Sequence, residues 1–507
     1  MSENYNISPG KEDAERIASG YRRVPISLSM PAEDITPADC FLKLKRLSKQ
    51  CFILESLEDE ADTGRYTFIG YDPKMGITCK DGVMTIRGGA SFEIETKDPA
   101  VQIRKVLADN LSPKIEGLPP FTGGLVGYFS YDFIKYAEPK IALGEEDAED
   151  FQDIDLMLFD KVVCFDRYEK TVIFIVNMLT DTFDENYNRA ASEISHLRDI
   201  VFGGEKAAPE KLALTSEWRA LFGQGRYGAM VRAAKRHIFE GDIFQVVLSN
   251  RLEAGATGSL FETYQIMSRT NPSPYMFYFS SDEIEIAGAA PETLVKLREG
   301  NLYTFPLAGT RGRGQTPEED AALEADLLSD PKELAEHNML VDLGRNDIGR
   351  ISKFGSVAVE KYMTIERFSH VMHIGSTVAG EIRADKDAVD AISALLPAGT
   401  LSGAPKIRAC QIIGELEGKR RGIYGGAVGY IGLDGDMDTC IAIRIAYKKN
   451  DRIFIRSGAG IVADSVPENE YAECGRKLAA VVRAIEEAAG VEQPLDYDTV
   501  EEGGEAK

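Results

Sequence analysis

Two pairs of glutamates offer the clearest chemistry in this sequence. Glu470 and Glu473 stand three residues apart in one predicted helix, and Glu333 and Glu336 have the same spacing in another. Residues three apart share a face of a helix, so each pair would present its carboxylates together. If the two helices met, the four carboxylates would repel one another or take up protons, and a hard divalent cation would relieve this strain. Their meeting would therefore imply a metal site.

The residues before Glu470 predict a glycine turn beside its helix. Ile453–Ile455 is predicted to form a short strand, and Gly458-Ala459-Gly460 a turn whose backbone N–H groups could hold an anion. Ser465, with Glu468 three residues later, predicts a capping box that starts a helix running toward Ala488. A turn of this kind beside two carboxylates suits a cation that bridges the protein and an anionic ligand.

The other glutamate pair stands at the start of a helix with clear end signals. Asp330-Pro331 predicts an N-cap and the first helical residue, and Gly344 predicts the end of the helix. Each pair also has a purely structural interpretation. Glu473 could form an ion pair with Lys477 one turn away on a solvated face, and Glu333 could be occupied in capping as the third helical residue.

Length and composition limit the class of protein. A chain of 507 residues, 44% of them hydrophobic, is too long for one simple core, so two large lobes are expected. Its 82 acidic and 58 basic residues give a net charge of −24, which argues against nucleic acid or an anionic membrane as the partner. The seven cysteines lack C-x-x-C spacing, and the N-terminus lacks an apolar signal core. The longest strongly apolar run, Val172–Val176, is too short to span a bilayer, so we expect a cytoplasmic protein.

Turn, strand and charge signals divide the chain into five expected segments. Residues 1–22 are a polar lead-in, 23–200 a strand-rich N-terminal lobe, and 201–224 a linker region rich in glycine, lysine and alanine. Residues 225–490 form the second lobe, and the acidic residues 491–507 are expected to be a disordered tail.

Several stretches of the second lobe carry possible chemistry. Gln245 follows a turn and enters a buried strand, where a hydrogen-bonded core amide is the plain alternative. The stretch Phe305–Gly314 is a loop rich in glycine and arginine. Pro397–Lys406 precedes a helix and could hold an anion, although its spacing to lysine excludes a Walker A loop. His370 and His373 are two of the five histidines, and on a strand they would face opposite ways.

Five motifs, in this order, make the sequence resemble one family. They are PLAGTRGRG, ELAEHNMLVDLGRNDIGR, PAGTLSGAPK, IYGGAVGYI and SGAGIVADSVPENEYAEC. Over about residues 50–490 the chain is similar to the chorismate-utilising enzymes, and within them to the large subunits (component I) of anthranilate synthases. The resemblance implies an α+β fold, with two large, mainly antiparallel β-sheets in a sandwich, helices on the outside and two interleaved lobes.

The resemblance assigns ligand and substrate roles to particular residues. Glu336 and Glu473 are implied as direct ligands of Mg²⁺, and Glu333 and Glu470 are implied to reach the ion through water, which Mg²⁺ retains readily. The residues implied to contact chorismate are Gly309, Thr310, Tyr424, Arg444, Gly458, Ala459 and Gly460. A planar guanidinium at Arg444 suits the enolpyruvyl carboxylate of chorismate.

The implied reaction converts chorismate and ammonia to anthranilate and pyruvate. Ammonia adds at C2 as the C4 hydroxyl leaves, and the C2 proton and the enolpyruvyl group are then lost. Glu292 matches the family's general acid, His373 the histidine implicated in the later proton transfer, and Thr400 a pocket residue. Relatives that use water carry a lysine where this chain has Gln245, so ammonia is favoured as nucleophile. The family's Ser-Ser is Ala289-Ala290 here, which changes the hydrogen bonding expected near Glu292.

The resemblance further implies an inhibitor and a partner. In the family, tryptophan is the feedback inhibitor of this first step of tryptophan biosynthesis. Its implied site consists of Leu54, Glu55, Ser56, Pro274, Tyr275, Met276, Val428, Tyr430 and Cys440. Since the chain shows no glutaminase domain with a nucleophilic cysteine, a glutamine amidotransferase subunit (component II) is the implied source of ammonia, within a heterotetramer.

Three alternatives stay open at this point. Aminodeoxychorismate synthase component I, of the folate pathway, is the closest, but Ala308 and Thr400-Leu401-Ser402 favour anthranilate synthase. A non-catalytic amino-acid sensor would keep the inhibitor pocket and lose the metal carboxylates. A di-metal oxidase would need two Glu-x-x-His sets, whereas Glu333 and His337 are four residues apart.

Overall fold

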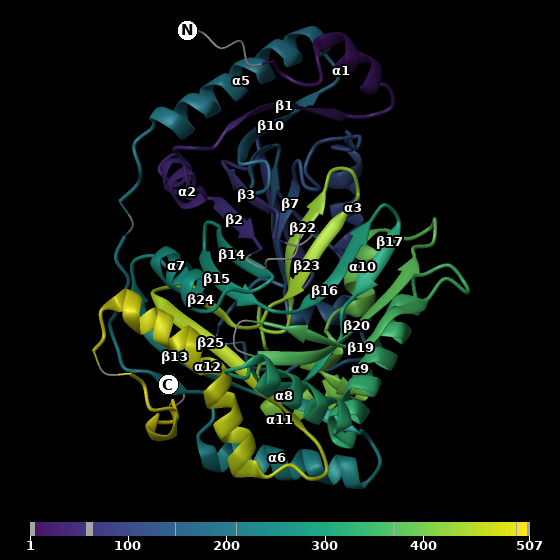
Figure 1. The fold of residues 1–507 in the computed structure, drawn as a ribbon, viewed down its shortest axis with the longest axis vertical. Helices are drawn as coiled ribbons and strands as arrows, with labels where there is room; N and C mark the ends of the chain where they lie inside the picture. The colour runs from purple at the N-terminus through teal and green to yellow at the C-terminus, as the bar shows by residue number, and fades with distance from the viewer. Residues whose placement is uncertain are drawn as a thin grey trace.

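Two large β-sheets dominate the fold. The computed structural model describes residues 6–56, 64–147, 149–208, 210–368, 371–492 and 494–503. Within these residues one sheet has 13 strands and the other 12, and the named strands pair antiparallel. Helices lie around the sheets (Figure 1). The predicted α+β fold with two large antiparallel sheets is confirmed.

The first sheet combines strands from both ends of the chain. In spatial order they are β1 (Arg23–Pro31), β10 (Thr171–Leu179), β9 (Lys161–Asp166), β3 (Tyr66–Tyr71), β2 (Cys51–Glu55), β14 (Tyr275–Ser280), β15 (Ile284–Ala290), β24 (Ile445–Lys449), β25 (Arg452–Ile461), β13 (Gln245–Thr257) and β11 (Ala213–Leu214). The short strands β12 (Arg219–Ala220) and β21 (Gly403–Ala404) also pair with β13. The predicted linker region 201–224 thus contributes two strands to this sheet.

The second sheet is built in the same mixed way. Its order is β18 (Leu307–Gly312), β20 (Val371–Glu381), β17 (Asn301–Thr304), β16 (Thr293–Arg298), β23 (Met437–Ile441), β22 (Ala427–Gly432), β7 (Gly124–Phe129), β8 (Ile154–Phe159), β4 (Met75–Lys80), β5 (Val83–Arg87) and β6 (Ser91–Glu95), and β19 (Ala358–Arg367) pairs with β20. Because β2 pairs with β14 and β7 with β22, the two lobes share both sheets.

The helices of the described residues differ widely in length. They are α1 (Lys11–Ile17), α2 (Pro37–Lys45), α3 (Ala100–Ala108), α4 (Ile134–Ala137), α5 (Phe183–Gly203), α6 (Gln224–Phe239), α7 (Phe261–Thr270), α8 (Pro317–Ser329), α9 (Pro331–Gly349), α10 (Ala388–Leu395), α11 (Lys406–Glu417) and α12 (Pro467–Ala489). None of those helices combines the length and apolar character that crossing a bilayer requires.

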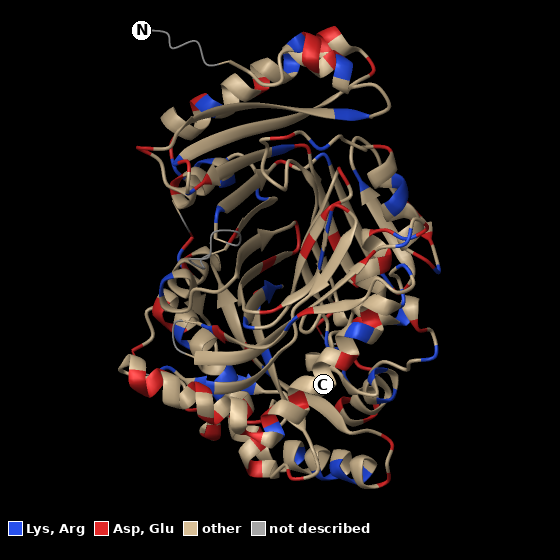
Figure 2. Cartoon of the chain, turned by 45° about the vertical axis from the view of Figure 1, so that its right-hand side comes forward, with Lys and Arg blue, Asp and Glu red and all other residues tan. Residues whose placement is uncertain are grey.

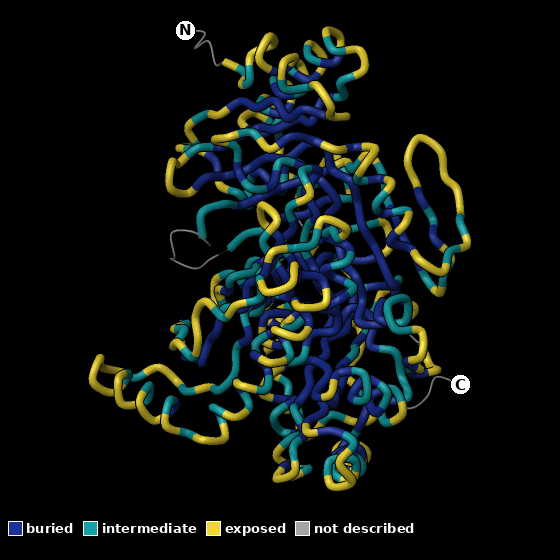
Figure 3. Tube along the Cα trace, turned by 90° about the vertical axis from the view of Figure 1, so that its right-hand side faces the viewer, coloured by how far each residue is buried: buried dark blue, intermediate teal, exposed yellow. Residues whose placement is uncertain are grey.

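Hydrophobic packing explains the layered arrangement. One buried cluster draws side chains from both sheets, among them Phe52, Phe159, Phe277 and Tyr447. Other clusters join the first sheet to helices such as α5, α7 and α12, and the second sheet to α3 and α10. The central strands are therefore buried, and exposure is concentrated at loops and outer helices (Figure 3). Acidic and basic residues lie mainly in these outer parts of the molecule (Figure 2).

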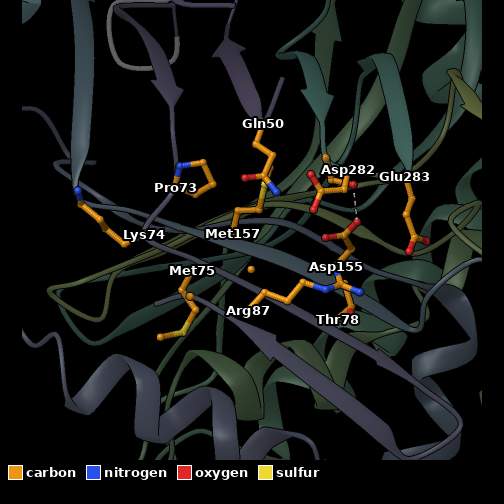
Figure 4. A pocket seen from close by; sticks show the side chains of 13 residues that line it. Gln50, Pro73, Lys74, Met75, Thr78, Arg87, Asp155, Met157, Asp282 and Glu283 are labelled. Atoms are coloured by element: carbon orange, nitrogen blue, oxygen red, sulfur yellow. Dashed lines mark hydrogen bonds between the residues drawn. The ribbon is translucent and has the colours of Figure 1, made fainter. Parts of the chain in front are cut away.

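A buried carboxyl group ties the interleaved lobes together. Asp155, on β8, accepts a 2.9 Å hydrogen bond from the Ser281 hydroxyl in the β14–β15 turn. The two residues line a cavity of about 190 Å³ together with Arg87, Asp282 and Glu283 (Figure 4). Burial raises the pKa of Asp155 to about 7, because the surrounding protein replaces the water that would solvate its charge.

The prediction of a glycine turn at residues 458–460 is wrong. Residues 458–460 continue strand β25, and their partners on β13 are Ser249, Leu248 and Val247. Close packing, not a reversal of the chain, requires the glycines here. A Cβ atom on Gly460 would lie 2.5 Å from Nε2 of Gln245, and one on Gly458 would lie 3.0 Å from the Tyr424 hydroxyl.

Two helix ends also differ from the prediction. Helix α9 begins at Pro331 as expected, with Asp330 accepting hydrogen bonds from the N–H groups of Lys332 and Glu333, but it continues through Gly344 to Gly349. A Cβ atom on Gly344 would come within 3.2–3.4 Å of Thr304 and Pro306, so glycine at this position allows the helix to pack closely against these two residues. Helix α12 starts after Val466 without a side-chain cap, because the Ser465 hydroxyl accepts from the Val462 N–H instead.

Part of the predicted disordered tail packs on the body. Residues Tyr497–Thr499 form a 3₁₀ turn, and the Tyr497 hydroxyl accepts a 2.8 Å hydrogen bond from Asn250. Its ring lies 4.8 Å, centroid to centroid, from that of Tyr471 on α12. An aromatic anchor explains why an acidic segment is held here.

Candidate active site

The first glutamate pair lies at the start of α9, next to a glutamine of the first sheet. Gln245 Nε2 donates a 3.3 Å hydrogen bond to Oε1 of Glu336. Glu333 lies 3.6 Å from a guanidinium nitrogen of Arg311, and burial followed by the charge of Glu336 raises the pKa of Glu333. Gln245 is therefore more than a hydrogen-bonded amide in the core, because its side chain contacts a carboxylate on α9, a helix that packs on the second sheet.

The second pair lies in the first turns of α12. Burial raises the pKa of Glu470, and the charge of Glu473 adds to that effect. The ammonium group of Lys332, at the start of α9, opposes it, which places the beginnings of α9 and α12 near one another. Glu473 forms a 2.8 Å ion pair with Lys477, so the structural interpretation of that residue also describes a real contact.

The four glutamates do not form a tight cluster in the described structure. In the described part of the chain, only His237, Glu240 and Asp242 bring three ligand atoms within 4.8 Å of one another. Arg408 already pairs with Asp242 at 2.9 Å in that group. The glutamates of α9 and α12 thus remain two separate pairs. Gln245 contacts the α9 pair through Glu336, and the charge of Lys332 on α9 acts on Glu470 of the α12 pair.

Glu292 has the environment of a carboxyl group that keeps its proton near neutral pH. It accepts a 3.1 Å hydrogen bond from the Thr400 hydroxyl. Burial raises its pKa to about 7, while the Thr400 hydrogen bond and the charges of Arg444 and Lys477 act in the opposite direction. A carboxyl with this pKa can donate a proton at neutral pH and accept one back, which suits a general acid.

His373 is oriented by the backbone of the PLAGT strand. Its Nδ1 lies 2.8 Å from the Gly309 carbonyl oxygen and 3.1 Å from the Thr310 hydroxyl. A carbonyl oxygen only accepts, so Nδ1 carries the proton and Nε2 keeps its lone pair. Burial lowers the pKa of His373, and Arg444 lowers it further, so the ring is neutral near pH 7 and Nε2 can accept a proton.

Gly309 joins His373 to the carboxylates. Its φ of +69° lies in the left-handed region, and a Cβ atom there would come 3.0 Å from Leu327 and 3.2 Å from Oε2 of Glu333. The one residue type that tolerates both the dihedral and the contact is glycine. Gly309 therefore accepts the hydrogen bond of His373 through its carbonyl oxygen, and its missing side chain leaves room for the Glu333 carboxylate.

The predicted substrate-carboxylate residues converge at the same place. Arg444 adopts a φ of +52°, unusual for a non-glycine residue, and its charge acts on both Glu292 and His373. Arg444 is exposed as a residue, although burial lowers the pKa of its guanidinium group. Tyr424 is buried beside Gly458 of β25. Ala459 lies between the two glycines but is fully buried in the core cluster beneath the strand.

Two residues take part in this region through contacts that the sequence did not predict. Lys477 donates a 3.0 Å hydrogen bond to the Gly458 carbonyl oxygen, pairs with Glu473, and acts on Glu292, so it connects three parts of the site. Thr293, directly after Glu292, lies 2.8 Å from the Tyr275 hydroxyl. The spacing of Lys477 after Glu473 signalled an ion pair only, and no motif signalled Thr293. His370 lies outside the described residues.

All nine predicted inhibitor residues line one cavity. It has a volume of about 440 Å³ and lies between the two sheets, with Tyr275 on β14 and Tyr430 on β22. The predicted residues in its wall are Leu54, Glu55, Ser56, Pro274, Tyr275, Met276, Val428, Tyr430 and Cys440. Arg167 pairs with Glu55 at 2.9 Å, and the Ser56 hydroxyl has no hydrogen-bond partner among the described residues. An amino acid would fit this mix of apolar walls and polar groups.

Comparison with known proteins identifies the family. Residues 49–483 match the chorismate binding enzyme family. The chain is 44% identical to anthranilate synthase component 1 of Aquifex aeolicus (strain VF5) over 490 residues, which is 95% of this chain and 98% of that relative. It is 42% identical to the component 1 of Acetivibrio thermocellus, over 95% of this chain and 99% of the relative.

Solved structures agree on the fold. Anthranilate synthase component I from Streptococcus pneumoniae TIGR4 superposes with a TM-score of 0.72 at 36% identity, covering 89% of this chain and 98% of that one. The menaquinone-specific isochorismate synthase of Escherichia coli shares the fold alone, with a TM-score of 0.69 at 18% identity over 94% of this chain and 98% of that chain. The chain belongs to the chorismate binding enzyme family.

Proposed function

We propose that the protein is the component that makes anthranilate from chorismate and ammonia, releasing pyruvate. The observation that carries the proposal is the contact between Gln245 and Glu336. A neutral amide at this position leaves the nucleophile without a lysine base, which suits ammonia, already nucleophilic as the free amine, better than water. The similarity to anthranilate synthase components 1 over most of the chain supports the same activity.

Glu292 and His373 divide the proton transfers in this proposal. As ammonia bonds to C2 of chorismate, the C4 hydroxyl leaves and the Glu292 carboxyl protonates it to water. The new ammonium group then releases one proton, which balances the proton that Glu292 gave. His373 then removes the C2 proton through Nε2, and the enolpyruvyl group leaves and takes up a proton to become pyruvate. Thr400 orients the acid, and the Gly309 carbonyl orients the base.

A divalent cation fits the two glutamate pairs. The donor set consists of carboxylate oxygens, the ligands that Mg²⁺ prefers, and the pKa values of Glu333 and Glu470 are raised partly by their acidic neighbours. We assign Glu336 and Glu473 as direct ligands and Glu333 and Glu470 as ligands through water. Bound there, the ion would neutralise the ring carboxylate of chorismate. Lys477 would have to exchange part of its contact with Glu473 for the ion.

A partner and an inhibitor belong to the same proposal. The relatives' designation as component 1 suggests that a second component, a glutamine amidotransferase, supplies the ammonia. The cavity of about 440 Å³ supports tryptophan as feedback inhibitor. Millimolar tryptophan should suppress the initial rate with ammonia as nitrogen donor, and an unchanged rate would exclude that assignment.

Product identification tests the proposal. The purified protein is incubated with chorismate, Mg²⁺ and ammonium chloride, and the aromatic product is identified by fluorescence and mass spectrometry. Anthranilate is the expected product. Aminodeoxychorismate without anthranilate would instead assign the chain to the folate pathway, and isochorismate would mean that water is the nucleophile.

A further inference from the structure

Tyr275 links the predicted inhibitor cavity to the short segment that carries Glu292. Tyr275 and Ala290 are paired residues of β14 and β15, so the backbone of Tyr275 lies against one end of the Ala290–Thr293 segment. Its hydroxyl, 2.8 Å from the Thr293 hydroxyl, holds the other end. One residue of the cavity wall, through its backbone and its hydroxyl, therefore lies at both ends of the segment that contains Pro291 and Glu292.

The direction of the hydrogen bonds is fixed by an acidic neighbour. Tyr275 donates its proton to Oδ1 of Asp438 at 2.7 Å, and Asp438 forms a 3.2 Å ion pair with Lys296. Since a carboxylate in an ion pair only accepts, the Thr293 hydroxyl must donate to the phenol oxygen. Asp438, Tyr275 and Thr293 thus form one directed chain that ends beside Glu292.

Thr293 borders two cavities at once. It lines the predicted inhibitor cavity, and it also lines a smaller one of about 40 Å³ whose wall includes Glu292 and Thr400. Thr293 is the first residue of β16, and the pairing of β16 with β23 slips in register between Thr293 and Val295. A bulge re-aims a side chain and interrupts the ladder of strand hydrogen bonds at that point.

Glu292 itself is held at two points on the opposite side. Its backbone carbonyl accepts a 2.9 Å hydrogen bond from the Ile441 N–H, and its carboxyl group accepts a hydrogen bond from the Thr400 hydroxyl. A ligand that moves Tyr275 would pull on Thr293 while Ile441 and Thr400 hold their positions. The expected result is a rotation of the Glu292 carboxyl away from the substrate.

From this geometry we infer that Thr293 is a positioning residue, through which occupation of the cavity misaligns Glu292. The inference rests on the proposed function and on tryptophan as the cavity's ligand. It assigns a transmission role to a residue whose own contacts are to Tyr275, not to the reacting atoms.

Replacing Thr293 by valine removes the hydroxyl and keeps the branched shape. For Thr293→Val we expect tryptophan binding, measured by calorimetry, to change little, while the tryptophan concentration for half-inhibition of anthranilate formation rises at least about tenfold. In the parent, tryptophan should shift the alkaline limb of the kcat–pH profile, and in the variant this shift should vanish. Thr293→Ser, which keeps the hydroxyl, should restore both responses.

Thr439→Val is the matched control. Thr439 lies on the neighbouring β23 and donates a 2.8 Å hydrogen bond to the Val295 carbonyl, so its loss disturbs the same strand pair without touching Tyr275. This variant should keep the parental half-inhibition. If Thr293→Val does not fold, Tyr275→Phe breaks the same link from the other side. Because Tyr275 itself lines the cavity, its half-inhibition concentration is compared with its own dissociation constant for tryptophan, and the ratio of the two should rise above the parental ratio.

The outcomes distinguish this inference from the proposed function. Failure of the parent to make anthranilate would overturn the proposed function. A parent that makes anthranilate, together with a Thr293→Val variant inhibited at the parental tryptophan concentration or a Tyr275→Phe variant with the parental ratio, would overturn the inference alone. So would a parent that tryptophan does not inhibit.

Discussion

At the scale of single residues, the site depends on groups whose protonation is set by burial. Glu292 keeps a proton near neutral pH because the protein around it raises its pKa to about 7. His373 is pushed the other way, and its Gly309 contact leaves Nε2 as the basic atom. One group is thus prepared to give a proton and the other to take one. Arg444, close to both, can hold an anionic substrate between them.

The pKa of Glu292 predicts an alkaline limit to turnover. The acid form is present below the pKa, so kcat/KM, which reports ionisation of the free enzyme, should fall as pH rises through about 7. Glu292→Gln keeps the acceptor for Thr400 but has no proton to give, and should lower kcat by about 10³-fold and remove this limb. Steady-state rates of anthranilate formation between pH 6 and 9 provide the measurement. A variant with parental kcat would exclude Glu292 as the acid.

The Thr400→Val variant tests whether the alkaline limb belongs to Glu292. The Thr400 hydrogen bond stabilises the charged carboxylate and lowers the pKa of Glu292, so its removal should raise that pKa. The alkaline limb should move to higher pH in Thr400→Val while the variant remains active. A limb that stays in place, or moves to lower pH, would contradict the assignment of the limb to Glu292.

At the scale of elements, local patterns in the sequence predicted helix starts and strands better than the path of the backbone between distant segments. The spacing of Glu333 and Glu336, the Asp330 cap and the strand after Gln245 are local patterns, and the structure has them. The path of residues 458–460 could not be predicted, because their partner strand β13 lies two hundred residues earlier in the chain. Gly344 was misleading for the same reason, since its purpose is contact with Thr304 and Pro306.

The cap of α9 should contribute to stability. Asp330 accepts hydrogen bonds from the N–H groups of Lys332 and Glu333, and it pairs with Arg311 at 3.1 Å. Asp330→Ala should therefore lower the free energy of unfolding by about 1 kcal/mol, measured by urea denaturation. The matched control, Asp342→Ala, removes an exposed carboxylate from the middle of the same helix and should change little. Equal losses in the two variants would mean that capping is not the cause.

At the scale of the whole molecule, the two lobes are one folding unit because they share both sheets. Strand β14 of the second lobe lies between β2 and β15, and β22 lies between β7 and β23. The resemblance to a known family implied this interleaving, but composition and periodicity alone do not, since strand order is set by pairing between distant segments. The Thr293 link across the sandwich has no sequence signature for the same reason.

The burial of Asp155, where the two lobes meet, should make stability depend on pH. The folded chain holds the Asp155 proton up to about pH 7, whereas an unfolded chain releases it at the ordinary, lower pKa. The free energy of unfolding should therefore fall as pH rises through that window. Asp155→Asn removes this loss and should add on the order of 2 kcal/mol at pH 8 and little at pH 4. Urea denaturation at both values provides the test.

Asp34→Asn, an exposed change in the N-terminal lobe, is the control for that comparison. Its effect should be small and similar at the two pH values. An Asp155→Asn variant that gained no more at pH 8 than at pH 4 would show that the buried carboxyl does not lose stability on ionisation.

The assignment of the glutamates on α9 and α12 to one cation site can be tested by titrating Mn²⁺ into the protein and recording the electron paramagnetic resonance signal of the free ion. Chorismate is present and ammonia is omitted, so that substrate occupies the site without turnover. We predict one bound ion per chain in the parent and in Glu240→Gln, which alters the separate His237–Glu240–Asp242 cluster, and loss of that binding in both Glu336→Gln and Glu473→Gln. Binding that survives in the last two variants and disappears in Glu240→Gln would contradict the assignment.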